Sequence, residues 1–156
     1  FYSHNFGHDG PLSFFGLGVN GKISELQAAM GLAVFPHIEE IIHARKTVVD
    51  FYNSQLNWVR IMKIKIRENT LWNYSYYPIV FESEDLLLLV QKKLNELDIF
   101  PRRYFYPSLN TIKYTNGKSM PISESISSRV LCLPLYVGLT HEQLLLISTT
   151  INSAIR

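Results

Sequence analysis

The sequence predicts an α/β fold in which helices pack on a small, mainly antiparallel sheet. Segments with a helical repeat of hydrophobic residues alternate with segments rich in β-branched and aromatic residues. Hydrophobic residues make up 47% of the 156 residues and charged residues 18%, a balance that can build a core. Two capping boxes, which begin at Ser24 and Thr140, mark the starts of two helices.

The N-terminal third is predicted to be an arm followed by two helices. Residues 1–23 are rich in glycine and lack a regular hydrophobic repeat, so we expect a loop-rich arm. The first helix begins at Ser24, and Pro36 should stop or kink it. Helical spacing of hydrophobic residues then continues from Ile38 to Leu56. We expect three parts: the arm (1–23), connecting helices (24–57) and a small C-terminal α/β domain (58–156).

The remaining residues predict the elements of that domain. Alternation favours a half-exposed strand over residues 61–67, and aromatic and β-branched residues favour a buried strand over 72–81. Ser83 should cap a helix that runs to about Leu97. The elements expected after it are a third strand (99–106), a loop (107–118), a short helix (123–129), a short strand (131–136) and a terminal helix that buries Leu144, Ile147, Ile151 and Ile155.

Composition argues against several classes of protein. The net charge of +2 is too small to predict nucleic-acid binding, and no apolar run reaches the ~18 residues of a membrane span. The single cysteine, Cys132, lies between leucines and is expected to be a buried apolar group. The five histidines are scattered and lack metal-ligand spacing, so we expect no metal site.

Two segments could bind a ligand. Glycines at 16, 18 and 21 precede the helix start at Ser24, where a phosphate is chemically sensible, but an ordinary turn explains the pattern as well. Residues 102–106 join two arginines to three aromatic residues, which could pair with and stack on a nucleotide. The alternative there is an edge strand with two solvated arginines, and a nucleic-acid-binding module is a further alternative.

Four ordered motifs resemble the DegT/DnrJ/EryC1/StrS aminotransferases, which make amino sugars on nucleotide carriers. Residues 18–29 read GVNGKISELQAA, in which Ile23 replaces the family's usual Met. Residues 37–52 are similar to the family's long helix. The other two motifs are YPSL at 106–109 and LCLPLYVGLT at 131–140.

This resemblance implies the small C-terminal domain of the aspartate-aminotransferase-like architecture, fold type I of the pyridoxal-phosphate enzymes. It implies that Asn20 reaches across a homodimer to the cofactor phosphate of the partner subunit. It also implies that Arg103 and Tyr106 lie by the sugar-nucleotide site and that His8 lines the substrate side. In the family a His stands where this chain has Asn110, so the sugar contacts should differ.

The resemblance further implies a cytoplasmic enzyme that uses pyridoxal 5'-phosphate to move an amino group, from a donor such as glutamate, onto a dTDP-linked 4-keto-6-deoxyhexose. The family's Schiff-base lysine lies upstream of the residues seen here, so this chain alone should be inactive. No nucleic-acid or membrane partner is expected. The alternative is a non-catalytic dimerisation or interaction module, or a truncated gene product.

Overall fold

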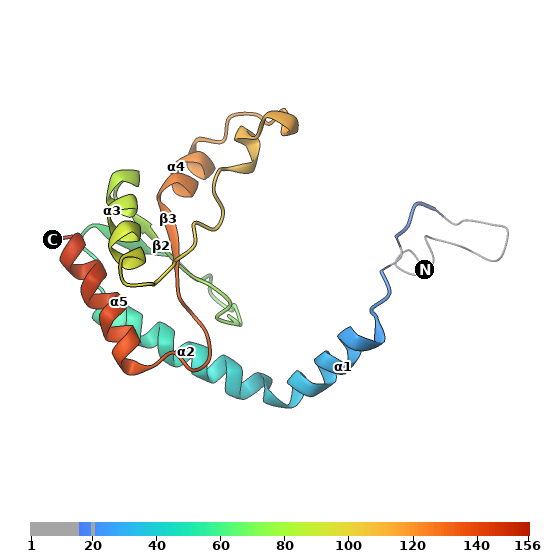
Figure 1. Cartoon of the computed structure of the whole chain (residues 1–156). Coiled ribbons are helices and arrows are strands. Elements are labelled where there is room, and N and C mark those ends of the chain that lie inside the picture. Colours follow the sequence, from blue (N-terminus) through green and yellow to red (C-terminus); the bar gives the residue numbers. More distant parts are fainter. Residues whose placement is uncertain (1–15, 20) are drawn as a thin grey trace. The chain divides into compact units, whose positions relative to one another are not determined.

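A computed structural model describes residues 16–19 and 21–156 of the chain (Figure 1). The predicted arm therefore lies largely outside the described residues. The chain divides into two compact units, residues 1–39 and 40–156. The division falls in the first turn of helix α2 (Ile38–Gln55).

Helix α1 (Glu25–Val34) begins as the sequence predicts. The backbone N–H of Gln27 donates to the Ser24 hydroxyl at 3.3 Å, and the N–H of Ser24 donates to the Gln27 side chain at 2.8 Å. A 3₁₀ turn, η2 (Phe35–His37), holds Pro36 and separates α1 from α2. No residue of α1 is buried within the described structure, and its large apolar side chains, such as those of Leu26 and Met30, are exposed.

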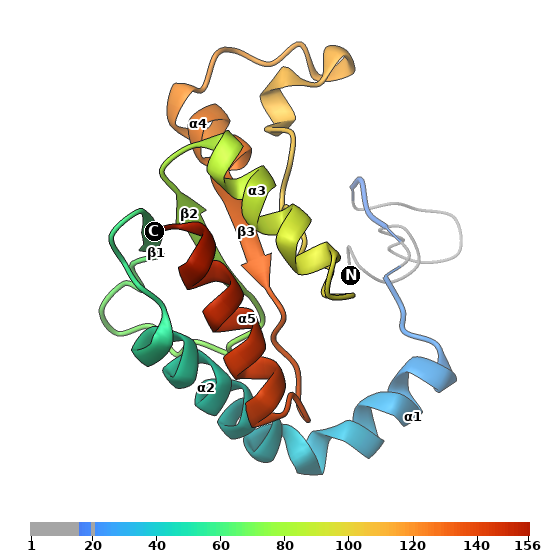
Figure 2. The same cartoon turned by 60° about the vertical axis from the view of Figure 1, so that its left-hand side comes forward.

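The second unit is built on a three-stranded antiparallel sheet. Its strands are β1 (Ile61–Lys63), β2 (Tyr77–Phe81) and β3 (Val130–Leu133), with β2 in the centre. Helices α3 (Glu84–Asn95) and α5 (His141–Ala154) pack against each other beside the sheet (Figure 2). A short helix, α4 (Pro121–Arg129), leads directly into β3. The mixed helix and small-sheet architecture that the sequence predicts is confirmed.

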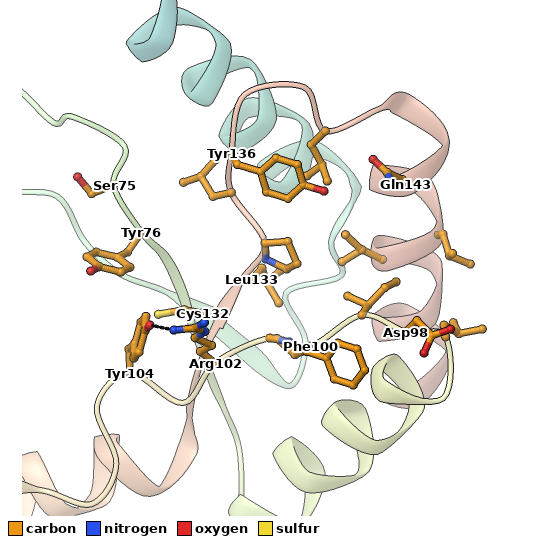
Figure 3. Close-up of a pocket in the computed structure, with 18 residues that line it drawn as sticks. Ser75, Tyr76, Asp98, Phe100, Arg102, Tyr104, Cys132, Leu133, Tyr136 and Gln143 are labelled. Atoms are coloured by element: carbon orange, nitrogen blue, oxygen red, sulfur yellow. Dashed lines mark hydrogen bonds between the residues drawn. The ribbon is translucent and has the colours of Figure 1, made fainter. Parts of the chain in front are cut away.

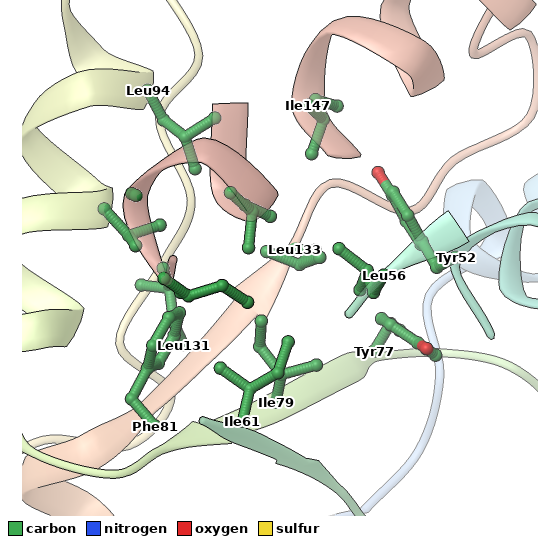
Figure 4. Packing of buried hydrophobic residues seen from close by; sticks show 14 of the residues in the cluster. Tyr52, Leu56, Ile61, Tyr77, Ile79, Phe81, Leu94, Leu131, Leu133 and Ile147 are labelled. Carbon is green, nitrogen blue, oxygen red and sulfur yellow. The ribbon is translucent and has the colours of Figure 1, made fainter. Parts of the chain in front are cut away.

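The core fills the space between α2, α3, α5 and one face of the sheet (Figure 4). The rings of Tyr52 and Tyr77 stack there with centroids 5.1 Å apart. The Tyr52 hydroxyl donates to the carbonyl of Pro134 at 2.9 Å, and the Tyr77 hydroxyl donates to the Asn53 side chain at 3.0 Å. Both hydroxyls thus keep a partner inside the core. The four predicted core residues of the terminal helix, Leu144, Ile147, Ile151 and Ile155, are all buried.

The first strand is shorter than predicted, because it ends at Lys63 and not at residue 67. The backbone N–H and carbonyl of Cys132 both form hydrogen bonds with Arg102, on the side of β3 away from β2. Pro78 lies opposite Cys132 in the sheet, so the backbone groups of Pro78 point the other way, toward β1. If the register of β1 and β2 continued, Ile64 would be the residue opposite Pro78. Proline has no N–H to donate, and pairing stops.

The second strand also begins late, at Tyr77 and not at Trp72. Tyr74 has a φ of +52°, which is left-handed backbone and incompatible with a continuous strand. The aromatic residues before Tyr77 therefore form an irregular segment, although Trp72 and Tyr74 still pack against the core.

The predicted third strand over 99–106 is wrong. The structure has only an isolated bridge between Arg102 and Cys132, whose backbones exchange hydrogen bonds of 2.8 and 3.2 Å. Pro101 cannot donate to a ladder, and the N–H of Tyr104 donates back to the Arg102 carbonyl at 3.1 Å. The chain therefore turns away from β3 after a single pair.

The other boundaries differ by a few residues. Helix α3 ends at Asn95, and α4 begins earlier than predicted, with Pro121 in its first turn. Strand β3 ends at Leu133 because Pro134 follows it. The loop over 107–118 contains two 3₁₀ turns, η3 (Leu109–Thr111) and η4 (Lys113–Thr115). Among the described residues, no helix has both the length and the hydrophobicity needed to cross a membrane.

Candidate functional site

The structure describes two of the four predicted binding residues. Arg103 and Tyr106 lie in the segment that links the Arg102 bridge to η3. Asn20 and His8, the predicted cofactor-phosphate and substrate contacts, lie outside the described residues. The geometry of the site is therefore built from residues of the second unit.

Arg103 is held from several sides. Its Nη2 donates to Glu84 Oε1 at 2.6 Å and to the carbonyl of Ser128 at 2.7 Å. Glu84 stands in the first turn of α3, and Ser128 lies near the end of α4. Only 16% of the Arg103 side chain is exposed, so this arginine joins two helices and is not solvated.

Tyr106 takes its position from Arg103. The guanidinium carbon of Arg103 lies 3.8 Å from the centroid of the Tyr106 ring, a close cation–π contact. Half of Tyr106 remains exposed. The predicted pair is thus brought together, but its members differ: Arg103 is engaged within the fold, whereas Tyr106 presents free surface.

Asn110 stands at the position where the family resemblance leads one to expect a histidine. Its Oδ1 accepts from the Ser108 hydroxyl at 2.6 Å, and its Nδ2 donates to Glu124 at 2.7 Å and to the Lys118 carbonyl at 3.0 Å. The N–H of Met120 also donates to Glu124, and these two bonds lower the pKa of that carboxyl. Asn110 therefore ties the loop to α4.

One hollow lies over the sheet face opposite the core. Its volume is about 590 Å³, and Val80, Val130 and Met120 contribute to an apolar lining. Tyr104 and Phe105 form part of its wall. This hollow offers shape and apolar surface, with Ser108 and Asn110 as polar groups already bonded to each other.

A second hollow, of about 640 Å³, lies beside the Arg102 bridge (Figure 3). Arg102 donates from Nη1 to the Tyr104 hydroxyl at 2.5 Å. The Tyr104 ring meets Tyr76 edge to face, with centroids 5.5 Å apart. Leucines, prolines and Ile147 supply the apolar wall. We call the trio of Arg102, Tyr104 and Tyr76 the Arg–Tyr cluster.

Cys132 lines the same hollow but is only 7% exposed. Burial raises the pKa of its thiol, and a hydrogen bond from the Tyr104 backbone opposes the shift in part. The thiol is therefore neutral near pH 7, as the prediction of a buried apolar cysteine requires.

The described residues do not by themselves make a pyridoxal-phosphate site. All the lysines are described, and each is exposed or only half buried, whereas a Schiff-base lysine is activated by desolvation. Lys46 pairs with Asp50, whose hydrogen bond and charge raise the lysine's pKa. The part of the chain that the structure describes also has no cluster of three metal-ligating side chains.

Sequence reasoning missed Tyr76, which belongs to the run of aromatic residues that predicted a buried strand. The alternation of side chains between the two faces of the sheet along β2 could have revealed it. Residues 76, 78 and 80 fall on the sheet face opposite Ile79 and Phe81, which are buried in the core. Sequence reasoning did identify the segment of arginines and aromatic residues over 102–106, but it named only Arg103 and Tyr106 as binding residues and gave Arg102 no such role.

Comparison with known proteins gives this geometry a context. The sequence profile of the DegT/DnrJ/EryC1/StrS aminotransferase family matches residues 2–152. The chain is 36% identical to a dTDP-4-amino-4,6-dideoxy-D-glucose transaminase of Escherichia coli over 88% of its length, and 35% identical to that of Shigella dysenteriae over 95%. These matches cover 40% and 42% of the two relatives, so the chain spans about two fifths of their length.

Solved structures agree on the fold. DesV from S. venezuelae, in complex with a ketimine intermediate, matches with a TM-score of 0.82 at 21% identity, over 97% of this chain and 42% of DesV. A DegT DnrJ EryC1 StrS aminotransferase from Brucella abortus matches with a TM-score of 0.81 at 22% identity, over 97% of this chain and 41% of that one. The predicted aminotransferase small-domain architecture is thereby confirmed. Since the family profile covers nearly all 156 residues, the chain belongs to the DegT/DnrJ/EryC1/StrS aminotransferase family.

Proposed function

We propose that the chain is the C-terminal portion of a pyridoxal-phosphate-dependent aminotransferase. The parent enzyme would transfer an amino group from glutamate to the keto group of a dTDP-linked 4-keto-6-deoxyhexose. The observation that carries this proposal is the 36% identity to a dTDP-4-amino-4,6-dideoxy-D-glucose transaminase, which extends over 88% of the chain. A purely structural interaction module is less favoured, because these relatives are named as enzymes.

Within that enzyme we assign this chain the binding surfaces of the small domain. Residues 58–156 form the domain, residues 24–57 connect it, and the arm over 1–23 carries Asn20 toward the cofactor phosphate of the partner subunit. His8 and Tyr106 would contact the nucleotide sugar. Arg103, which has two hydrogen-bond acceptors inside the fold, would orient Tyr106 and act through it.

The cofactor lysine would come from the part of the parent that precedes this chain. The exposure of the described lysines supports this division. The parent would be a cytoplasmic homodimer, and its product an amino sugar for polysaccharide assembly. One similar protein, from Salmonella typhimurium and 25% identical, is named for lipopolysaccharide biosynthesis.

The test compares the parent protein with the 156-residue chain. Each is incubated with pyridoxal phosphate, glutamate and the dTDP-linked 4-keto-6-deoxyhexose, and the amino sugar is measured by mass spectrometry. We expect product from the parent and none from the chain. Borohydride treatment of the chain with pyridoxal phosphate should leave no adduct at a single lysine. A parent that makes no amino sugar from any dTDP-linked keto sugar would sink the proposal.

A further inference from the structure

We infer that the hollow beside the Arg–Tyr cluster binds the nucleotide of the substrate, with the diphosphate at Arg102 and the base on Tyr76. The choice of a nucleotide rests on the proposed function, whereas the site itself rests on the chemistry of the cluster. Its volume of about 640 Å³ lies in the range of ordinary ligand pockets.

Arg102 provides an available positive charge. Three other arginines near the sheet already have partners: Arg103 pairs with Glu84, Arg60 pairs with Glu82, and Arg129 donates to the Phe81 carbonyl. Arg102 has no carboxylate within ion-pair distance among the residues that the structure describes. Toward the described residues its side chain makes one hydrogen bond, to the Tyr104 hydroxyl, which leaves most of its donors unused there.

The position of that charge is fixed by the backbone. Arg102 exchanges two hydrogen bonds with Cys132 in β3, and the Tyr104 hydroxyl then steers its guanidinium (Figure 3). A guanidinium held at both its base and its tip loses less freedom when it binds a phosphate. Asp98 also lines the hollow, and within the described part of the chain no ion pair joins it to Arg102.

Tyr76 provides a surface for stacking. One neighbour of Tyr104 is Phe105, which stacks on it with centroids 5.0 Å apart, so Tyr104 is already partly covered. Tyr76 meets Tyr104 at 90° and is 51% exposed. Aromatic faces of this kind stack on nucleobases, and a cation beside them suits the phosphates. A nucleotide therefore matches the cluster, because its planar base can stack on Tyr76 and its phosphates can bind Arg102.

The proposal is tested on the ¹⁵N-labelled 156-residue chain by NMR titration with dTDP, thymidine and inorganic pyrophosphate. We expect saturable shifts at the amides of Tyr76, Arg102 and Tyr104 with dTDP. Thymidine and pyrophosphate, which each lack one half of the ligand, should bind about tenfold more weakly.

Substitutions separate the two halves of the site. Arg102→Gln keeps the backbone bridge to Cys132 and should weaken dTDP binding about tenfold, while thymidine binding stays unchanged. Tyr76→Leu should weaken both ligands, and Arg102→Lys should retain part of the affinity for dTDP. Arg60→Gln is the matched control, because Arg60 pairs with Glu82 and should leave dTDP binding as in the wild type. Circular dichroism checks that each variant is folded.

Two results would overturn the inference. The first is no saturable shift at about 1 mM dTDP. The second is equal affinity for dTDP and pyrophosphate, or shifts centred on the lysines of residues 63–65, which would show general attraction of anions. A transaminase assay of the parent keeps the two proposals apart. If Arg102→Gln leaves its KM for the sugar nucleotide unchanged, the nucleotide site fails while the activity stands. If dTDP binds at the cluster but the parent transfers no amino group, the activity fails while the site stands.

Discussion

Adjacent arginines in this chain have opposite environments. The side chain of Arg103 is 16% exposed and bridges two helices, whereas that of Arg102 points into a hollow and is bonded to one tyrosine hydroxyl. The sequence could mark the segment as a candidate because arginines suit phosphates and aromatic rings suit stacking on a base. It could not assign the two roles, which depend on Glu84 and Ser128, far away in the chain.

At the residue scale we predict that Arg103→Gln destabilises the chain by about 1–3 kcal/mol, because the Glu84 carboxylate and the Ser128 carbonyl lose a charged donor. Urea unfolding followed by circular dichroism measures the change. Arg60→Gln removes a more exposed ion pair, with side chains 39% and 59% exposed, and should cost less than about 1 kcal/mol. Equal losses in the two variants would contradict a supporting role for Arg103.

At the scale of elements, local signals predicted the helices better than the strands. Capping boxes at Ser24 and Thr140 and a cap at Ser83 need only neighbouring residues, and all three are present. Strand ends depend on partners that are distant in sequence. The end of β1 at Lys63 is set by Pro78 across the sheet, and the loss of the strand over 99–106 is set by a turn after one bridge.

We predict that Pro78→Val lengthens β1. A valine N–H at position 78 would face Ile64, the next residue in the register, and complete a hydrogen-bonded pair. Hydrogen exchange should show new protection at the amides of residues 64 and 78. The amide of Val80 already lies in the ladder opposite Met62 and serves as the internal reference. Unchanged exchange at Ile64 would show that something other than the missing N–H ends the strand.

At the scale of the whole molecule, folding buries two tyrosine hydroxyls and a thiol, and burial favours the neutral form of each. Burial raises the pKa values of Tyr52 and Tyr77 above the ordinary 10.0, and that of Cys132 above 9.0. The family could be recognised from ordered motifs over most of the chain, but this set of buried hydroxyls and a thiol becomes visible only when the sheet and helices are assembled.

This set predicts sensitivity to alkaline pH. Above about pH 9 the unfolded chain releases protons that the folded chain retains, so the free energy of unfolding should fall as pH rises. Each buried group should contribute up to about 1.4 kcal/mol per pH unit above its ordinary pKa. Urea unfolding between pH 7 and 11 measures the slope.

The matched variants for this slope are Tyr77→Phe and Tyr114→Phe. Tyr77→Phe removes one buried hydroxyl and should flatten the slope. Tyr114 is 83% exposed, so Tyr114→Phe should leave the slope unchanged. An unfolding free energy that stays constant up to pH 11 would argue against neutral burial of these groups.

Tyr104 lines both hollows of the small domain, one with its neighbour Phe105 and the other with Arg102. The Tyr104 ring is therefore a wall that the two hollows share. A ligand that rotates this ring in one hollow must change the shape of the other hollow. By linkage, each ligand would then change the affinity of the other by the same factor. Substitution of Tyr104 would therefore change ligand binding in both hollows at once. Tyr76 and Met120 each line only one of the two hollows, so substitutions at these positions test each hollow separately.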